Sequence, residues 1–337
     1  MDIHELVEKI RGQRILVIGD VMLDHYVWGA ASRISPEAPV PVVDVTRDSF
    51  AAGGAANVAL NLASLGGSPL LAGRTGEDEG GSLLSGILAD NGVEQIKGFA
   101  GGQCRTIRKT RIMVRNQQLC RIDREDGVAA YGMDEAIARE SLLQGLEGAN
   151  AVILSDYGKG SISEDLISWI LSEADSRGLP VSLDPKPRRR LQFSGVDLMT
   201  PNRAEALELA GLSPHLKEEF PADEVCSRIW ERYQPGYLVI TLGADGILLS
   251  EEGRPTRRIP TYARQVFDVS GAGDTVIASL MLALSAGADL ASAARLANLA
   301  AGVVVGKVGT ATVSSEEILA YLARHPDLSD PAGETVL

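Results

Sequence analysis

The seven residues from Asp268 to Asp274, with the sequence DVSGAGD, have the residue types of a phosphoryl-transfer site. Two glycines flank an alanine, and an apolar run over residues 275–286 follows directly. Such a loop turns tightly and exposes backbone N–H groups where a helix begins, which attracts an anion such as phosphate. Asp274 would repel that anion. Its position therefore favours a role as the base that takes a proton from an acceptor hydroxyl. The alternative is an ordinary turn in which Asp274 caps the helix.

A second glycine pair opens the segment Gly53-Gly54-Ala55-Ala56-Asn57. Small side chains at a helix start let a polar ligand approach the backbone, and the Asn57 amide can both donate and accept hydrogen bonds. A sugar hydroxyl suits these groups. The alternative is close packing of a helix on a sheet, with Asn57 bonded to a neighbouring loop.

Two further segments fit the nucleotide side of such a site. Asn202-Arg203-Ala204-Glu205 follows a predicted strand, and its Asn and Glu have the spacing of a helix capping box. In a functional interpretation, Glu205, and less directly Asn202, lie near a hydrated Mg²⁺ on the nucleotide phosphates. Residues 241–246, with the sequence TLGADG, form either a hairpin turn or the border of a ribose and phosphate site.

Basic residues gather in two places of this acidic chain. Because strand side chains alternate with period two, four of them share one face of a predicted strand: Arg105, Lys109, Arg111 and Arg115. The second group follows Asp184-Pro185 and consists of Lys186, Arg188, Arg189 and Arg190. Charge runs are usually solvated. Two such groups beside predicted site edges nevertheless favour a substrate that already carries a phosphate, with Lys186 as the first candidate contact and Lys109 or Arg111 as the second.

Composition restricts the class of protein. The 337 residues include 36 glycines, 45% hydrophobic and 4% aromatic residues, a mix that favours parallel strands joined by tight turns to Ala-rich helices. The formal net charge of -13 argues against general nucleic-acid binding, which rests on positive charge. The most apolar stretch, residues 276–290, is interrupted well short of the ~20 residues that span a bilayer. Three cysteines without metal-type spacing, and no apolar signal core in residues 1–11, predict a cytoplasmic protein that binds no membrane.

Short aliphatic and β-branched runs predict buried parallel strands at residues 14–19, 151–155, 181–184, 196–200 and 237–241. Ligands bind at the carboxyl ends of such strands. The polar residues at these ends are therefore site candidates: Asp20, Asp24, Asp156, Asp184, Asn202 and Glu205. Residues 25–47 and 104–124, the latter turning near Arg115-Asn116-Gln117, predict two hairpins that form a small lid sheet and exclude water from the site.

The three motifs at residues 53–57, 202–205 and 268–274 occur in an order that resembles the ribokinase-like carbohydrate kinases of the PfkB family, over about residues 14–323. Within that family, residues 32–42 (SRISPEAPVPV) are the segment most specific to the heptose-phosphate kinases of ADP-heptose biosynthesis. Residues 19–24, 115–119, 154–160, 184–186 and 301–307 are similar to those kinases as well. The resemblance implies phosphorylation of D-glycero-β-D-manno-heptose 7-phosphate at its anomeric oxygen, on the way to the lipopolysaccharide core.

The resemblance also implies roles for single residues. Asp274 becomes the catalytic base, and the N–H groups of Gly271, Ala272 and Gly273 form an anion hole. ATP binding is assigned to Asn202, Arg203, Ala204, Glu205, Thr241, Gly243, Gly246 and Asn298, with Mg²⁺ held by Glu205 through water. Acceptor binding, including the basic candidates above, is assigned to Asp24, Gly53, Gly54, Asn57, Lys109, Arg111, Asp184 and Lys186. A monovalent cation, K⁺ for example, is placed at Asp268.

The implied fold is a three-layer α/β/α domain over residues 1–330, with a mostly parallel central sheet of about eight or more strands and a β-sheet lid that pairs in a homodimer. Residues 331–337 are expected to be a loose tail. Bifunctional relatives continue into a nucleotidyltransferase half, so a separate nucleotidyltransferase is expected to act after this chain. The sequence leaves two alternatives: a kinase for another sugar, sugar phosphate or nucleoside, and a non-catalytic sugar-binding protein.

Overall fold

The computed structural model describes residues 1–337 except 103, 116, 134–135, 215–218, 308 and 330–333. Its largest element is a ten-stranded sheet with the spatial order β16 (Thr335–Val336), β15 (Arg254–Ile259), β14 (Ile247–Glu251), β13 (Tyr237–Thr241), β12 (Leu198–Met199), β11 (Val181–Asp184), β10 (Ala151–Ser155), β1 (Arg14–Gly19), β4 (Ser68–Ala72) and β6 (Glu94–Gln95). The pairs from β13 to β6 are parallel, and those from β13 to β16 are antiparallel. The predicted parallel strands are present, although the one expected at residues 196–200 is shorter.

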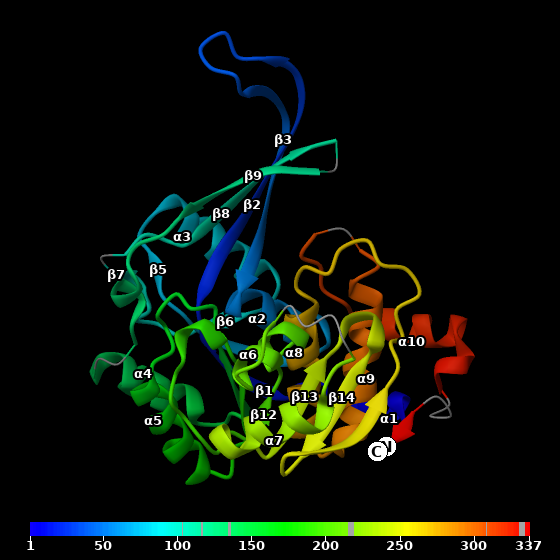
Figure 1. The fold of residues 1–337 in the computed structure, drawn as a ribbon. Helices are drawn as coiled ribbons and strands as arrows, with labels where there is room; N and C mark the ends of the chain where they lie inside the picture. The colour runs from blue at the N-terminus through cyan, green and yellow to red at the C-terminus, as the bar shows by residue number, and fades with distance from the viewer. Residues whose placement is uncertain (103, 116, 134–135, 215–218, 308, 330–333) are drawn as a thin grey trace.

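Helices cover both faces of this sheet, because successive residues of a strand point to opposite sides. In β1, Ile15 and Val17 pack into one hydrophobic core, while Leu16 and Ile18 pack into the other. The first core is covered by α1 (Ile3–Lys9), α2 (Ala55–Ser64), α3 (Glu79–Asp90), α8 (Ala272–Ser285), α9 (Leu290–Val304) and α10 (Ser315–Arg324). The second is covered by α4 (Ala136–Leu146), α5 (Glu164–Asp175), α6 (Arg203–Leu209) and α7 (Ala222–Tyr233). The predicted three-layer α/β/α architecture is confirmed (Figure 1).

Short elements connect these layers. They are the paired strands β5 (Thr75–Gly76) and β7 (Ala100–Gly102) and the 3₁₀ helices η1 (Val128–Tyr131), η2 (Pro187–Arg189), η3 (Gly243–Asp245) and η4 (Pro326–Ser329). Among the described residues, none of the helices combines the length and the apolar character needed to cross a membrane.

The predicted small sheet is present, with the strand order β3-β2-β8-β9. The strands β2 (Val21–Ile34) and β3 (Pro41–Gly54) form a long ribbon that reaches away from the body, and β8 (Arg108–Val114) and β9 (Gln117–Arg124) lie beside it (Figure 1). β2 and β3 extend past the predicted bounds of residues 25–47, since β2 follows Asp20 directly and β3 leads straight into α2, whereas β8 and β9 lie within the predicted residues 104–124. We call this sheet the lid. Asn116, in the predicted turn, lies outside the described residues.

Register decides which lid side chains share a face. Lys109 lies opposite Asp24 on β2 and Asp123 on β9, while Arg111 lies opposite Tyr26 and Arg121. We call the face with these six residues the inner face. Lys109 and Arg111 thus share a face, as predicted. The prediction that Arg105 joins them is wrong, because β8 begins only at Arg108 and the Arg105 guanidinium binds Asp126 at 2.7 Å instead.

The end of the chain is attached to the main sheet. Thr335–Val336 pair with β15, and the Glu334 carboxylate accepts hydrogen bonds from Arg257 at 2.7 Å and from Arg295. Glu334 has a side chain that is 2% exposed. Residues 334–337 are therefore held rather than loose, while residues 331–333 of the expected tail lie outside the described part of the chain.

Candidate active site

Asp274 lies at the point where α8 begins, against the start of α2 and the ends of β10 and β11. Gly271 caps α8 with a φ of 80°, and a Cβ atom there would come within 2.8 Å of the Asn57 side-chain nitrogen. Only glycine fits this close approach. At Gly273 the same construction meets no atom within 4 Å, so the helix start is open on that side.

Two donors hold the Asp274 carboxylate, one on each oxygen. Asn57 Nδ2 donates to Oδ2 at 2.6 Å, and the Tyr157 hydroxyl donates to Oδ1 at 2.5 Å. Burial raises the pKa of Asp274 from 3.8 to about 6, although both hydrogen bonds oppose this rise. The negative charge of Asp24 raises this pKa further, and Lys109 lowers it. A buried carboxylate with a pKa near 6 is ionised at neutral pH and basic enough to accept a proton from a hydroxyl.

The glycine pair before α2 serves the chain path. Gly54 has a φ of 60°, and a Cβ atom there would lie 2.3 Å from the Asp20 carbonyl oxygen; at Gly53 it would lie 2.8 Å from Asp24 Oδ2. Both positions therefore require glycine for close packing, as the packing alternative predicted. Asn57, by contrast, contacts Asp274 directly, which places its amide at the candidate base.

The inner face of the lid carries an ion pair over the site. Asp24 is 5% exposed and accepts a hydrogen bond from Arg111 Nη1 at 2.6 Å, while the Arg111 guanidinium lies 5.3 Å from the centre of the Tyr26 ring. The Tyr26 hydroxyl meets the Thr310 hydroxyl at 3.1 Å, so the lid contacts the loop after α9. Asp24 and Arg111, both predicted acceptor-binding residues, thus neutralise each other.

Replacing Arg111 with methionine removes one partner of this pair and leaves the Asp24 carboxylate buried without a cation. We expect the free energy of unfolding to fall by about 3 kcal/mol, measured by chemical denaturation at pH 7. Arg121→Met is the matched control, because the Arg121–Asp123 pair lies in the same sheet with side chains 48% and 30% exposed. It should cost less than about 1 kcal/mol. Equal losses in the two variants would contradict the account of this pair.

Lys109 is the cation of the inner face that lacks an ion-pair partner among the described residues. Its ammonium lies 5.8 Å from the centre of the Tyr157 ring. Burial lowers the pKa of Lys109, and the positive charges of Lys159, Arg121 and Arg111 lower it further, while Asp24 opposes them. The other cations are paired: Lys159 with Glu125 at 2.6 Å and Arg121 with Asp123 at 2.8 Å. Within the described part of the chain, the Lys109 ammonium therefore lies against an aromatic ring and forms no ion pair, although Asp24 and Asp123 are its neighbours in the register.

On the other side of Asp274, the predicted nucleotide residues are positioned by a capping box. Asn202 caps α6 by accepting from the backbone N–H groups of Ala204 and Glu205, and Glu205 Oε2 accepts from the Asn202 N–H at 3.1 Å. Glu205 Oε1 accepts from Lys186 Nζ at 3.1 Å. Lys186, the first candidate for a substrate phosphate, therefore lies with the predicted magnesium residue.

Three acidic side chains, Asp184, Glu205 and Asp274, lie near enough for their charges to interact. Burial raises the pKa of Asp184 well above its usual value, and the charges of Glu205 and Asp274 raise it further. Oxygen donors with excess negative charge suit Mg²⁺, which takes few protein ligands and keeps several waters. Glu205 therefore fits the predicted water-mediated contact, although the described residues contain no cluster of three or more His, Cys, Asp or Glu side chains.

Residues 241–246 turn the chain from β13 to β14, as the hairpin alternative predicted. Thr241 also forms an isolated parallel bridge with Asn202, so this turn lies beside the start of α6. Gly246 has a φ of 84°, and a Cβ atom there would lie 2.0 Å from the Ile259 carbonyl oxygen, whereas Gly243 faces open space. Arg203 Nη1, at the start of α6, lies 4.0 Å from Asp245 Oδ2 in this turn.

Asn298 and Asp268 fix loops around the site. The Asn298 amide accepts from the Tyr262 N–H at 3.3 Å and donates to the Pro260 carbonyl at 2.7 Å, which attaches the chain after β15 to α9. Asp268 accepts from the N–H groups of Ser270 and Gly309 at 2.9 and 3.1 Å. Burial raises the pKa of Asp268, but these hydrogen bonds outweigh it and leave the pKa below its usual value. The monovalent cation expected at Asp268 stays a prediction.

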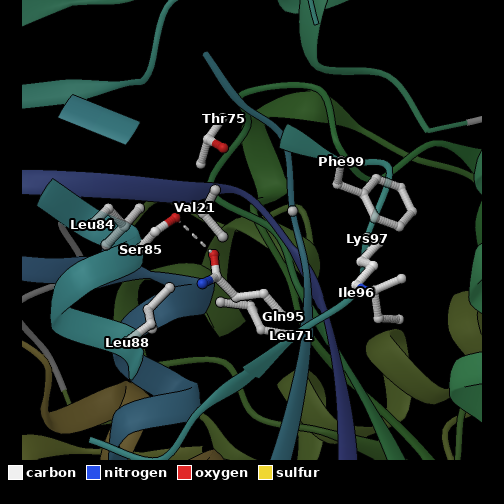
Figure 2. A pocket seen from close by; sticks show the side chains of 11 residues that line it. Val21, Leu71, Thr75, Leu84, Ser85, Leu88, Gln95, Ile96, Lys97 and Phe99 are labelled. Atoms are coloured by element: carbon white, nitrogen blue, oxygen red, sulfur yellow. Dashed lines mark hydrogen bonds between the residues drawn. The ribbon is translucent and has the colours of Figure 1, made fainter. Parts of the chain in front are cut away.

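A cavity of about 180 Å³ lies elsewhere, at the edge of the main sheet. Figure 2 shows its mostly apolar lining, with Leu84 and Leu88 of α3 facing Leu71 of β4, and one hydrogen bond from Ser85 to Gln95 at 3.2 Å. Lys97 is the only ionisable residue in this lining, and none of the candidate site residues belongs to it. This cavity therefore offers no group for phosphoryl transfer.

Sequence reasoning missed Tyr157 and Lys159, which the structure places at Asp274 and near Lys109. Both follow Asp156 in the loop after β10. Asp156 was itself selected as a site candidate because it lies just past the predicted strand. Their position could have identified them, because residues one and three places after the candidate Asp156 belong to the same loop.

The fold is that of ribokinase-like carbohydrate kinases. The chain is similar to the structure of Arabidopsis thaliana ribokinase complexed with ribose and ATP, with a TM-score of 0.72 and 21% identity over 93% of this chain and 99% of that one. It is equally similar to phosphofructokinase-2 from Escherichia coli in complex with substrates and products, with a TM-score of 0.72 and 18% identity over 93% and 99% of the two chains.

The family model for pfkB family carbohydrate kinases matches residues 13–318. The chain belongs to this family and is an ATP-dependent carbohydrate kinase. Its relatives include "Bifunctional protein HldE" of Geobacter metallireducens, 43% identical over 97% of this chain and 66% of that protein. The protein of the same name from Azotobacter vinelandii is 45% identical over 90% and 62%. The chain thus spans about two thirds of the length of these relatives.

Proposed function

We propose that this kinase phosphorylates D-glycero-β-D-manno-heptose 7-phosphate at its anomeric oxygen and forms heptose 1,7-bisphosphate. The observation that carries the proposal is the Lys109 ammonium on the inner face of the lid, which has no ion-pair partner among the described residues and acts on the charge of the candidate base. An acceptor that already carries a phosphate would give this ammonium an anionic partner. The similarity of residues 32–42 to heptose-phosphate kinases, and the identity of 41–45% to proteins named HldE, support this acceptor.

In the proposed reaction, Asp274 takes the proton of the anomeric hydroxyl while the oxygen of that hydroxyl forms its bond to the γ-phosphorus of ATP. The bond between the γ-phosphorus and the leaving oxygen breaks, and ADP departs. The N–H groups of Gly271, Ala272 and Gly273 stabilise negative charge on the transferring group. This role fits the open space beside Gly273. Transfer then depends mainly on positioning and electrostatics, as phosphoryl transfer generally does.

The donor side is assigned to the residues around the start of α6. Glu205 would hold Mg²⁺ through water, and the ion would offset charge on the ATP phosphates. We propose that Lys186, which pairs with Glu205, contacts the same phosphates in place of the acceptor phosphate that the sequence predicted for it. Residues 241–246 border the nucleotide from the adjacent turn.

The acceptor phosphate is assigned to the lid. Lys109 supplies a charge that has no ion-pair partner in the described part of the chain, and Lys159, Arg121 and Arg111 lie near it with further positive charge. Asp24 and Asn57 then remain for the sugar hydroxyls. Because Lys109 and Arg111 are on the lid and Lys159 is on the body, a phosphate between them would hold the lid closed over the acceptor.

An acceptor panel tests this proposal. Heptose 7-phosphate, fructose 6-phosphate, ribose and the unphosphorylated heptose would be compared at equal concentration with ATP, and ADP release would be measured. We expect kcat/KM to be highest for heptose 7-phosphate. A preference for an unphosphorylated sugar would refute the proposed role of the lid cations, and a preference for fructose 6-phosphate would refute only the identity of the sugar.

We propose further that the lid pairs with the lid of a second copy. Phe50 and Ile122 lie opposite His25 and Thr110 in the register, on the face away from the cations, and are 38% and 58% exposed. Sedimentation velocity at micromolar concentration should find a dimer, and Ile122→Lys should convert it to monomer. A monomeric wild type would contradict this pairing. A nucleotidyltransferase activity, whether on another protein or in a longer chain, is expected to consume the product.

A further inference from the structure

The Tyr157 hydroxyl has a place in the site that the proposed reaction does not yet explain. It donates a hydrogen bond of 2.5 Å to Asp274 Oδ1, whereas Asn57 serves Oδ2. Burial raises the pKa of Tyr157 well above its usual value, and the charges of Asp274, Asp184 and Glu205 raise it further. The phenol therefore stays protonated and remains a donor at neutral pH.

The loop that carries Tyr157 is fixed by a buried carboxylate. Asp20, at the end of β1, is 0% exposed and accepts the backbone N–H groups of Tyr157, Lys159 and Ser161 at 2.8, 2.8 and 2.9 Å. Gly160 adopts a φ of 116° where a Cβ atom would lie 2.0 Å from the Val128 carbonyl oxygen. A loop with this many fixed points holds the phenol in one place, so its hydrogen bond does not depend on a mobile side chain.

From this geometry we propose that Tyr157 is a positioning residue for Asp274, which keeps the carboxylate in a fixed orientation and in its ionised form until the acceptor hydroxyl arrives. The inference rests on the proposed function of Asp274 as the base. A carboxylate held by one donor on each oxygen cannot rotate, and the remaining lone pairs point in fixed directions. One of them can then face the acceptor.

The charges around Asp274 explain why this hydrogen bond matters. Asp24 from the lid lies near enough to interact with its charge and disfavours the ionised form, while the charge of Asp274 in turn raises the pKa of Asp184 on β11. Lys109 favours the ionised form, as do the hydrogen bonds of Tyr157 and Asn57. Removing the phenol hydroxyl therefore moves the balance toward the protonated form, which cannot act as a base.

The test is the pH profile of kcat/KM for Tyr157→Phe, with the acceptor that the panel selects. The wild type should lose activity as the pH falls through about 6, where Asp274 becomes protonated. We call this loss of activity at low pH the acid limb of the profile. In the variant we expect the acid limb to move to higher pH by about one unit, because a hydrogen bond to a charged group is worth about 1.5–3 kcal/mol. The loss should be largest below pH 7 and should shrink above pH 8.

Tyr321→Phe is the matched control, because the buried Tyr321 hydroxyl donates to the Tyr262 carbonyl at 2.8 Å and does not touch Asp274. Its acid limb should stay in place. A uniform loss at every pH in Tyr157→Phe would indicate a merely structural residue and overturn the inference. A lower KM for the acceptor with an unchanged acid limb would also overturn the inference, because the phenol would then hinder acceptor binding rather than position Asp274. Substantial activity in Asp274→Asn would instead refute the proposed base itself.

Discussion

Asp274→Asn is expected to lower kcat by about 10²–10⁴-fold, the usual contribution of a positioned general base. The amide can keep its oxygen toward Asn57 and turn its nitrogen toward the Tyr157 hydroxyl, so the local packing is retained. Affinity for ATP should change little, because the predicted nucleotide residues lie at the start of α6 and in the adjacent turn. Steady-state kinetics with a direct ATP-binding measurement would check both parts.

The same variant should be more stable than the wild type at alkaline pH. In the folded protein the pKa of Asp274 is raised from 3.8 to about 6, so folding favours the protonated form. Wild-type stability therefore falls as the pH rises from about 4 to 6, by up to about 3 kcal/mol. Asparagine does not ionise, so the difference between the proteins should be near zero at pH 4 and largest above pH 6. A variant with normal kcat and unchanged stability would contradict the proposed role.

Lys109→Met is expected to raise the KM for a phosphorylated acceptor by about 10- to 100-fold, the value of one charge-assisted hydrogen bond. The KM for the unphosphorylated sugar should change much less, and so should the KM for ATP. Lys109 also favours the ionised form of Asp274, so the acid limb of kcat/KM should move slightly to higher pH.

Arg124→Met provides the matched control for Lys109. Arg124 belongs to the same lid, but in the register it lies opposite Arg108, one residue out of phase with Lys109 and Asp123. Its side chain is therefore on the face away from the site, and its loss removes the same charge without touching the acceptor. Equal effects of the two variants would show that only the general positive charge of the lid matters.

Local patterns in the sequence predicted local structure well. The spacing of Asn202 and Glu205 predicted a capping box because both partners lie within one helical turn, and the structure contains it. The runs at residues 14–19 and 151–155 predicted parallel strands because strands buried on both faces are apolar throughout. In contrast, β15 has the sequence RPTRRI and is largely polar, so no hydrophobic pattern predicted this strand.

Contacts between distant segments were harder to predict. Tyr157 and Asp274 are separated by 117 positions, and they meet because the sheet places the end of β10 beside the start of α8. The Lys186–Glu205 pair likewise depends on the order of β11 and β12 and on the course of the chain after them. Arg105 was misplaced because a period-two pattern does not show where a strand begins.

The central claim is tested most directly by the structure of the product. The enzyme would be incubated with ATP, Mg²⁺ and D-glycero-β-D-manno-heptose 7-phosphate, and the product would be examined by ³¹P and ¹H NMR. We expect one new phosphate on the anomeric carbon, in addition to the phosphate at position 7. No turnover of this sugar, or a phosphate on any other oxygen, would contradict the account.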